Sequence, residues 1–202
     1  MEINFIIGIA VLIMSVVIHE VSHGYVANIC GDPTAKHQGR LTLNPIRHLS
    51  LWGSVIVPII FILSGTGIVL GWAKPVEINP YNFKNRRWGE FFTALAGPLS
   101  NIIMALLFVL ILRTLETSLS AKFIEFGIIV IDTNITLAVF NLVPVPPLDG
   151  SKILFTLFPK VFEKIRVYLE RYFLVFVMIF VVLFWDIISP IIPKIVLWLL
   201  GN

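Results

Sequence analysis

Long apolar segments dominate this chain, and its polar residues are concentrated between them. A helix needs about 20 apolar residues to cross a bilayer, and several of these segments reach that length. Only 13% of the residues are charged, whereas about a quarter are charged in soluble domains. The sequence therefore predicts an all-α polytopic membrane protein, a bundle of about five to six transmembrane or re-entrant helices. The apolar segments run from about Ile3 to Ile29, Leu49 to Leu70, Trp88 to Leu112, Phe123 to Val143, Phe173 to Trp185 and Ile187 to Leu200.

The remaining composition narrows the class of protein further. The net charge of +3 comes from basic residues that flank the apolar segments, so nucleic acid is not an expected partner. Cys30 is the single cysteine, which excludes an internal disulfide. Residues 1–18 lack a basic leader and a small-residue cleavage site, so we expect an uncleaved membrane span there. The length of 202 residues suits one membrane-embedded domain over residues 1–202.

The most informative motif, His19-Glu20-Val21-Ser22-His23, lies inside the first apolar segment. Positions i and i+4 of a helix project from one face, so His19 and His23 can grip a single metal ion. Glu20 then lies beside the ion, where a general base that activates water belongs. Ionisable side chains are costly in hydrocarbon, which favours a functional purpose over a chance match. The motif therefore predicts a metal site within the membrane.

Three stretches between the apolar segments are more polar, and their residue patterns predict other kinds of structure. Leu41 and Leu43 alternate with polar residues between Gly39 and Pro45, and residues 71–80 are similarly extended and limited by prolines. Both stretches predict short edge strands, so we expect a small β element at the membrane surface. Residues 160–173 carry apolar side chains near helical spacing among charged ones, which predicts an amphipathic helix in the membrane interface.

The distribution of basic residues bears on how residues 49–70 meet the membrane. If that segment crosses once, the flanking lysines and arginines divide nine against five between the two sides. If it enters and returns to the same face, they divide twelve against two. The second arrangement obeys the positive-inside rule far better, and it places the N-terminus outside and the basic loops in the cytoplasm. We therefore favour a re-entrant segment, with an ordinary kinked span as the alternative.

A third metal ligand is needed, because a catalytic zinc normally takes three protein ligands and a water. Asp149 follows three prolines that break the helix at the end of the fourth apolar segment. In the re-entrant topology that segment is parallel to the first, which brings Asp149 to the depth of His19 and His23. In the single-crossing topology the two segments oppose one another, and Asp149 would be an ordinary acid at a helix end.

Three motifs, in this order, resemble the site-2 proteases, a family of intramembrane zinc metalloproteases. They are H-E-x-x-H in the first segment, Ala96-Gly97-Pro98-Leu99-Ser100-Asn101 in a middle segment, and the N-x-x-P-x-P-P-L-D-G run that ends at Gly150. The stretches at 31–32, 39–45 and 71–80 resemble the compact prokaryotic branch of the family, and no PDZ domain is inserted. The resemblance covers roughly residues 4–157. Residues 158–202 then form amphipathic and packing helices at the C-terminus.

The resemblance implies a function and a site. It implies hydrolysis of peptide bonds within or near transmembrane segments of membrane proteins, by an enzyme with one Zn²⁺ per chain. His19, His23 and Asp149 would be the zinc ligands, and Glu20 would be the catalytic base. The substrate would be a transmembrane protein in the lipid bilayer of a prokaryotic cell membrane, and the active site would lie toward the cytoplasm.

Substrate binding is the least defined part of the expected site. The resemblance associates Asn101 and Asn141 with the site and with substrate, and buried amides that bridge helices are an equally good interpretation. An unwound substrate strand is expected to add to an edge at Leu41–Leu43 or Pro75–Ile78.

Two other classes of membrane protein remain as alternatives. A transporter or proton relay would also place histidine and glutamate within a span, but it would be expected to show two similarly broken halves. A di-iron oxidase or desaturase would need more histidines than this chain has. His37 and His48 are the remaining histidines, and both are predicted to be exposed loop residues.

Overall fold

The computed structural model describes residues 2–50, 53, 56, 59, 74–115 and 118–201, and the regular secondary structure of these residues is helical. Three of the helices are long and apolar enough to cross a membrane: α1 (Glu2–Cys30), α4 (Arg86–Leu115) and α5 (Ala121–Asn141). Many of their large apolar side chains are exposed, as expected of helices that face lipid. The prediction of an all-α polytopic membrane protein is therefore confirmed.

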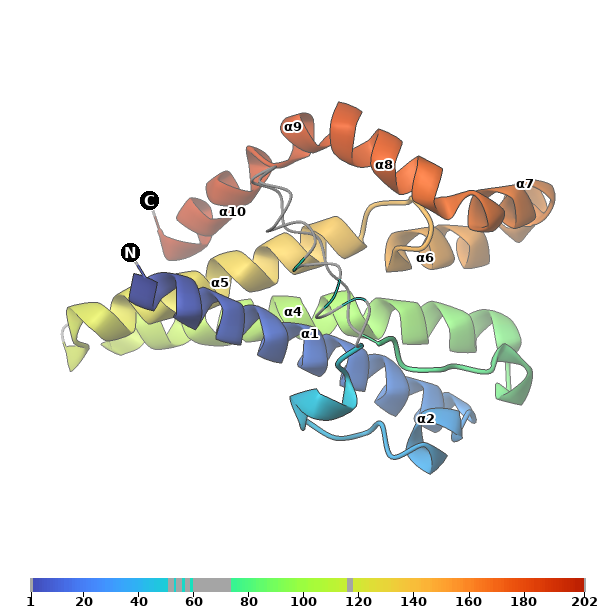
Figure 1. Cartoon of the computed structure of the whole chain (residues 1–202), viewed down its shortest axis with the longest axis horizontal. Helices are drawn as coiled ribbons and strands as arrows, with labels where there is room; N and C mark the ends of the chain where they lie inside the picture. Colours follow the sequence, from blue (N-terminus) through green and yellow to red (C-terminus); the bar gives the residue numbers. More distant parts are fainter. Residues whose placement is uncertain are drawn as a thin grey trace.

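The three long helices lie side by side, with α1 and α5 parallel (Figure 1). Near the start of both helices, Asn4 Nδ2 donates to Glu125 Oε1 at 2.6 Å. Midway along them, Asn134 Nδ2 donates to Ser15 Oγ at 2.9 Å. Because these contacts follow the same order along both helices, α1 and α5 are parallel. The re-entrant topology requires this arrangement.

Helix α4 runs opposite to α1, and the connection between them begins and ends at one end of the bundle (Figure 1). The backbone N–H of Lys84, just before α4, donates to the carbonyl oxygen of Cys30, the last residue of α1, at 3.0 Å. Within the connection, the N–H of Lys74 donates to His48 O at 2.7 Å. The predicted re-entrant segment at 49–70 lies almost entirely outside the described residues, but the chain on its two sides meets at this hydrogen bond.

Short helices take the place of regular strands in the described parts of this connection: α2 (Thr34–His37), η1 (Pro45–Arg47) and η3 (Pro80–Asn82). The prediction of a small β element is wrong for the described residues, which contain no strand. Residues 74–79 are extended, but three of their backbone N–H groups donate to polar groups of other segments and not to a neighbouring strand. These are the N–H groups of Lys74, Val76 and Asn79. The alternation of polar and apolar residues therefore marked an extended chain without a strand partner.

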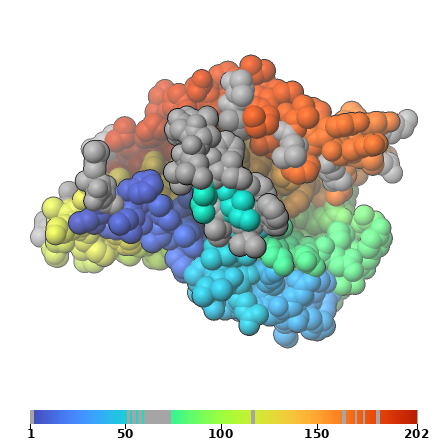
Figure 2. Space-filling model, in the orientation of Figure 1, coloured from blue at the N-terminus to red at the C-terminus, as the bar shows by residue number. Residues whose placement is uncertain are grey.

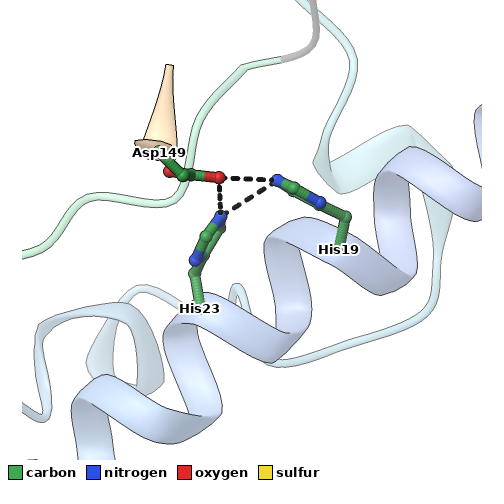
Figure 3. Close-up of side chains that lie close together, drawn as sticks. All are labelled: His19, His23 and Asp149. Atoms are coloured by element: carbon green, nitrogen blue, oxygen red, sulfur yellow. Dashed lines mark hydrogen bonds and ion pairs between the residues drawn. The ribbon is translucent and has the colours of Figure 1, made fainter. Parts of the chain in front are cut away.

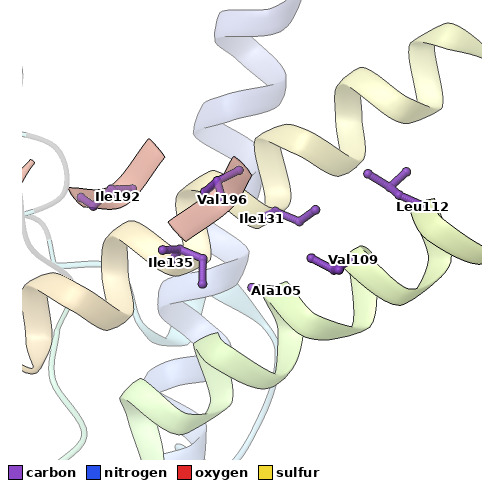
Figure 4. Close-up of a cluster of buried hydrophobic side chains, with 7 residues drawn as sticks. All are labelled: Ala105, Val109, Leu112, Ile131, Ile135, Ile192 and Val196. Atoms are coloured by element: carbon purple, nitrogen blue, oxygen red, sulfur yellow. The ribbon is translucent and has the colours of Figure 1, made fainter. Parts of the chain in front are cut away.

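Close packing of small and branched side chains joins α4, α5 and the C-terminal helix α10 (Ile191–Leu200). Helices in lipid gain little from the hydrophobic effect, so dispersion contacts between closely approaching backbones hold them together. Gly127 allows such an approach, since a Cβ there would lie 3.0 Å from Leu112 Cδ2. The cluster is drawn in Figure 4 and consists of Ala105, Val109, Leu112, Ile131, Ile135, Ile192 and Val196.

The C-terminal part of the chain forms a series of shorter helices on the same side of α4 and α5 in the view of Figure 1. These are α6 (Asp149–Leu157), α7 (Pro159–Arg171), α8 (Phe173–Leu183), α9 (Trp185–Ile188) and α10. Helix α6 packs against α4, and α10 packs against α5. Figure 2 shows them in orange and red along one edge of the molecule, opposite the blue residues around α2. Helix α7 covers the stretch predicted to be an amphipathic helix, and α10 packs against α5 and α4 as a packing helix would.

Candidate metal centre

Three side chains from distant parts of the sequence converge in the bundle (Figure 3). His19 and His23 project from one face of α1, and Asp149 reaches them from the first turn of α6. The two Nε2 atoms lie 3.0 Å apart, and Asp149 Oδ2 lies 3.2 Å from His19 Nε2 and 3.1 Å from His23 Nε2. All three residues are buried, with exposed fractions of 5–6%. The structure therefore brings together the three residues predicted to be ligands.

The other nitrogen of each imidazole has a partner that fixes the tautomer. His23 Nδ1 lies 2.6 Å from the backbone oxygen of Thr93, and a carbonyl oxygen only accepts, so Nδ1 donates. His19 Nδ1 lies 2.7 Å from Asn101 Oδ1 and donates in the same way. With a hydrogen on each Nδ1, a neutral imidazole presents a lone pair at Nε2. Partners of this kind typically orient histidines that bind metals.

Asn101 is itself held by a buried network between helices. Its Nδ2 donates to Asn134 Oδ1 at 2.8 Å, which turns Oδ1 toward His19. Asn134 Nδ2 in turn donates to Ser15 Oγ at 2.9 Å. Asn101 and Asn134 have no exposed surface. We infer that Asn101 orients His19, because its Oδ1 is bonded to His19 Nδ1 in the interior of the bundle. Its association with substrate stays a prediction.

The donor set fits a zinc ion. Two Nε2 lone pairs and a carboxylate oxygen converge to within 3.2 Å, and three electron-rich atoms at this distance repel one another unless a cation lies between them. Ligand atoms about 2.0–2.2 Å from a tetrahedral zinc ion lie about 3.3–3.5 Å apart, close to the observed separations. Two histidines and one carboxylate are also a recurrent ligand set of catalytic zinc.

Gly97 of α4 makes room for the centre. A Cβ at this position would lie 2.4 Å from His23 Nε2 and 2.6 Å from His19 Nε2, on the side where the lone pairs converge. A second glycine, Gly150, lets the chain turn beside the carboxylate of Asp149, since a Cβ there would lie 2.2 Å from the backbone oxygen of Leu142. Both positions therefore require the absence of a side chain.

Comparison with known proteins identifies the family. Peptidase family M50 matches residues 7–125 and 113–185 of the chain. The chain belongs to this family, the site-2 proteases. It is therefore a metalloprotease.

Several relatives of this site-2 protease carry related names. "Putative zinc metalloprotease YwhC" of Bacillus subtilis (strain 168) is 39% identical over 173 residues, which cover 82% of this chain and 75% of the relative. "Putative zinc metalloprotease Rip2" of Mycolicibacterium smegmatis is 32% identical over 148 residues, or 72% of this chain. The match spans 55% of the length of that relative. No solved structure matches the chain.

Glu20 of this site-2 protease is held from outside its own helix. The backbone N–H of Val76 donates to Glu20 Oε2 at 2.8 Å. Sequence reasoning placed Val76 in a possible substrate edge but missed its contact with Glu20, because that contact is made by a backbone donor. It also missed Thr93, Asn134 and Ser15, whose roles depend on which helices lie side by side.

The remaining candidate residues lie in other settings. Asn141 is half-buried at the end of α5, and its Nδ2 donates to Leu137 O of the same helix at 3.0 Å. Its role in substrate binding stays a prediction. His37 is exposed as predicted, but His48 is 1% exposed, so the prediction of an exposed loop residue is wrong for His48. The reason is that its Nε2 bonds to Thr42 O at 2.9 Å and its backbone oxygen accepts from Lys74.

A cavity of about 240 Å³ adjoins the metal centre at His23. One wall is apolar and includes Val76 and Ile78 of the extended segment. The lining also carries charge, with Lys152 beside Asp149 at 3.3 Å and Arg166 beside Glu90 at 3.2 Å. Ample space for a peptide side chain therefore exists next to the candidate ligands.

Proposed function

We propose that this site-2 protease hydrolyses peptide bonds within or near transmembrane segments of membrane proteins. The observation that carries the proposal is the position of the candidate metal centre. His19 and His23 lie on α1, a helix apolar enough to cross a membrane, and the third candidate ligand is buried against them. A protease that acted only on soluble substrates would have no reason to bear the cost of three ionisable groups at this place.

One zinc ion per chain would be held by His19, His23 and Asp149. When bound, it would polarise the scissile carbonyl and make a water molecule more acidic. Glu20, one residue from His19, is the group we assign as the base that accepts the proton from that water. Buried surroundings strengthen these electrostatic effects, because few water molecules screen them.

The substrate must be unwound locally before it is cut, because the carbonyl groups of a transmembrane helix are engaged in hydrogen bonds. We propose that the unwound stretch lies along the extended segment at Pro75–Ile78, since Val76 and Ile78 also line the cavity beside His23. Leu41–Leu43 is the alternative edge. A transmembrane protein in the lipid bilayer is thus the proposed partner.

For the orientation in the membrane, we propose that the N-terminus lies outside and that the centre faces the cytoplasm of a prokaryotic cell. Parallel α1 and α5 support this proposal, because they put the basic residues of the 31–48 and 74–87 stretches on the same side as those of α6 and α7. The positive-inside rule assigns that side to the cytoplasm.

The experiment that tests this function combines metal analysis with cleavage of a model transmembrane peptide. Wild-type protein in lipid vesicles should contain one zinc per chain and should cleave the peptide. Glu20→Gln should keep its zinc and lose cleavage by about 10²–10⁴-fold, the usual contribution of a general base. A Glu20→Gln protein that cleaves at the wild-type rate would contradict the assignment, and a wild type that never cuts the peptide would contradict the function.

A further inference from the structure

The extended segment at residues 74–79 is fixed to the rest of the protein by its own backbone. Three of its N–H groups have acceptors in three different stretches of the chain. These hydrogen bonds are Lys74 N to His48 O at 2.7 Å, Val76 N to Glu20 Oε2 at 2.8 Å, and Asn79 N to Asp32 Oδ2 at 2.7 Å. Hydrogen bonds therefore fix this segment on both sides of Val76, the residue whose N–H donates to the proposed base, Glu20.

Asp32 accepts several hydrogen bonds besides the one from this segment. It has no exposed surface, and both of its carboxylate oxygens accept hydrogen bonds. Besides Asn79 N, its donors are Asn82 Nδ2 at 2.8 Å, Thr34 N at 3.1 Å and the Thr34 hydroxyl. Burial raises the pKa of Asp32, but these hydrogen bonds outweigh burial and hold that pKa below its ordinary value.

Two glycines near Asp32 and Glu20 allow the chain around residues 74–84 to lie close to α1. Gly31 has φ +115°, a conformation that side-chain-bearing residues avoid, and it turns the chain from α1 into Asp32. Gly24 lies one turn after Glu20, where a Cβ would be 2.6 Å from Leu41 Cδ2 and 3.2 Å from Val76 Cγ1. A side chain at position 24 would thus force the side chains of Leu41 and Val76 to shift, which disturbs the packing of Val76 against α1.

We propose that Asp32 is a positioning residue for Glu20, because it fixes the extended segment so that the backbone N–H of Val76 holds the Glu20 carboxylate. A glutamate on an otherwise isolated helix face has several rotamers. A donor held at a fixed place selects one of them, and holding Oε2 also determines where Oε1 points. This inference rests on the proposed role of Glu20 as the base.

The test is a double-mutant cycle on the full-length protein in lipid vesicles, with every rate divided by bound zinc. Its members are Asp32→Asn, Val76→Pro and the double variant. Asp32→Asn keeps the shape and replaces one acceptor with a donor, and Val76→Pro removes the N–H that reaches Glu20. Val76→Ala is the matched variant, since it loses packing but keeps the donor.

We expect each single substitution to lower kcat about tenfold or more, because misplacement of the Glu20 carboxylate affects the proton transfer. KM does not enter this comparison, because the same segment is the edge proposed for the substrate. The double variant should be no slower than Val76→Pro, since both substitutions act through one hydrogen bond. Val76→Ala should lose much less than Val76→Pro. If Val76→Pro fails to retain zinc, Gly24→Ala replaces it in the cycle with the same expectation.

Several results would overturn the proposal. They are a wild-type kcat for Asp32→Asn, losses that multiply in the double variant, and an equal loss for Val76→Ala and Val76→Pro. A merely structural role of Asp32 gives multiplying losses, so the cycle separates the two roles. Failure of the proposed function has a different signature, because the wild type itself would then not cut the peptide. Failure of the assigned base would appear as a Glu20→Gln protein that cleaves at the wild-type rate.

Discussion

Asn101 Oδ1 and His19 Nδ1 lie 2.7 Å apart in the interior of the bundle, and this hydrogen bond joins α4 to α1. The orientation of the Asn101 amide is set by Asn134, so a residue of α5 determines which face the His19 imidazole presents. Three helices thus share in placing one candidate ligand.

Asn101→Leu should lower zinc affinity about 10–100-fold, the usual effect of losing a partner that orients a metal ligand. The substitution keeps the approximate volume but leaves His19 Nδ1 without an acceptor. Competition with a chromophoric chelator measures the affinity. Asn4→Ala is the control, since Asn4 is an exposed amide on α1 that pairs with Glu125. Equal zinc affinity in wild type and Asn101→Leu would contradict the role we infer for Asn101.

Gly97→Ala should abolish stoichiometric zinc binding, because its Cβ would occupy the space where the Nε2 lone pairs converge, 2.4 Å from His23 Nε2. Metal analysis of purified protein checks this outcome. Gly8→Ala is the matched control on α1, since a Cβ at Gly8 meets nothing within 4 Å. A Gly97→Ala protein that retained one zinc per chain would show that the ion binds elsewhere.

Removal of the metal should stop cleavage reversibly. Dialysis against a strong chelator should leave an inactive protein, and added zinc should restore the activity of the wild type. Asp149→Ala should not recover at zinc concentrations that restore the wild type, because it lacks one of three ligands and leaves Lys152 without its partner at 3.3 Å. Recovery of Asp149→Ala at wild-type zinc concentrations would exclude Asp149 as a ligand.

Asp32 predicts how stability depends on pH. Its pKa in the folded protein is lowered, so its contribution to stability is present above the pKa of the unfolded chain and is lost as the pH falls through the folded pKa. Wild type should therefore lose thermal stability below about pH 4, and Asp32→Asn should lack this part of the loss. Thermal unfolding in detergent between pH 3 and pH 7 compares the two. Parallel curves for both proteins would contradict the prediction.

The sequence predicted most of the candidate metal centre, because helical periodicity alone puts His19 and His23 on one face. Asp149 needed one further step, the parallel arrangement of α1 and α5, which the distribution of basic residues supplied. The failures have a common cause. Alternating residues at 39–45 and 71–80 were interpreted as strands, but a strand depends on a partner that local sequence does not reveal. His48 looked like a solvated loop residue for the same reason.

The contact between Val76 and Glu20 was beyond prediction for a different reason. It is made by a backbone N–H, which every residue but proline has, so residue identity gives no signal. Only Gly24, whose missing side chain allows the approach, hints at it in the sequence.

The wide separation of the candidate ligands along the chain has a consequence for biosynthesis. His19 and His23 emerge from the ribosome early, whereas Asp149 is translated only after α1, α4 and α5 are complete. A chain that ends before α6 holds two of the three candidate ligands, so we expect it to bind zinc weakly. We therefore expect the chain to be able to form the complete centre only after α6 has been made.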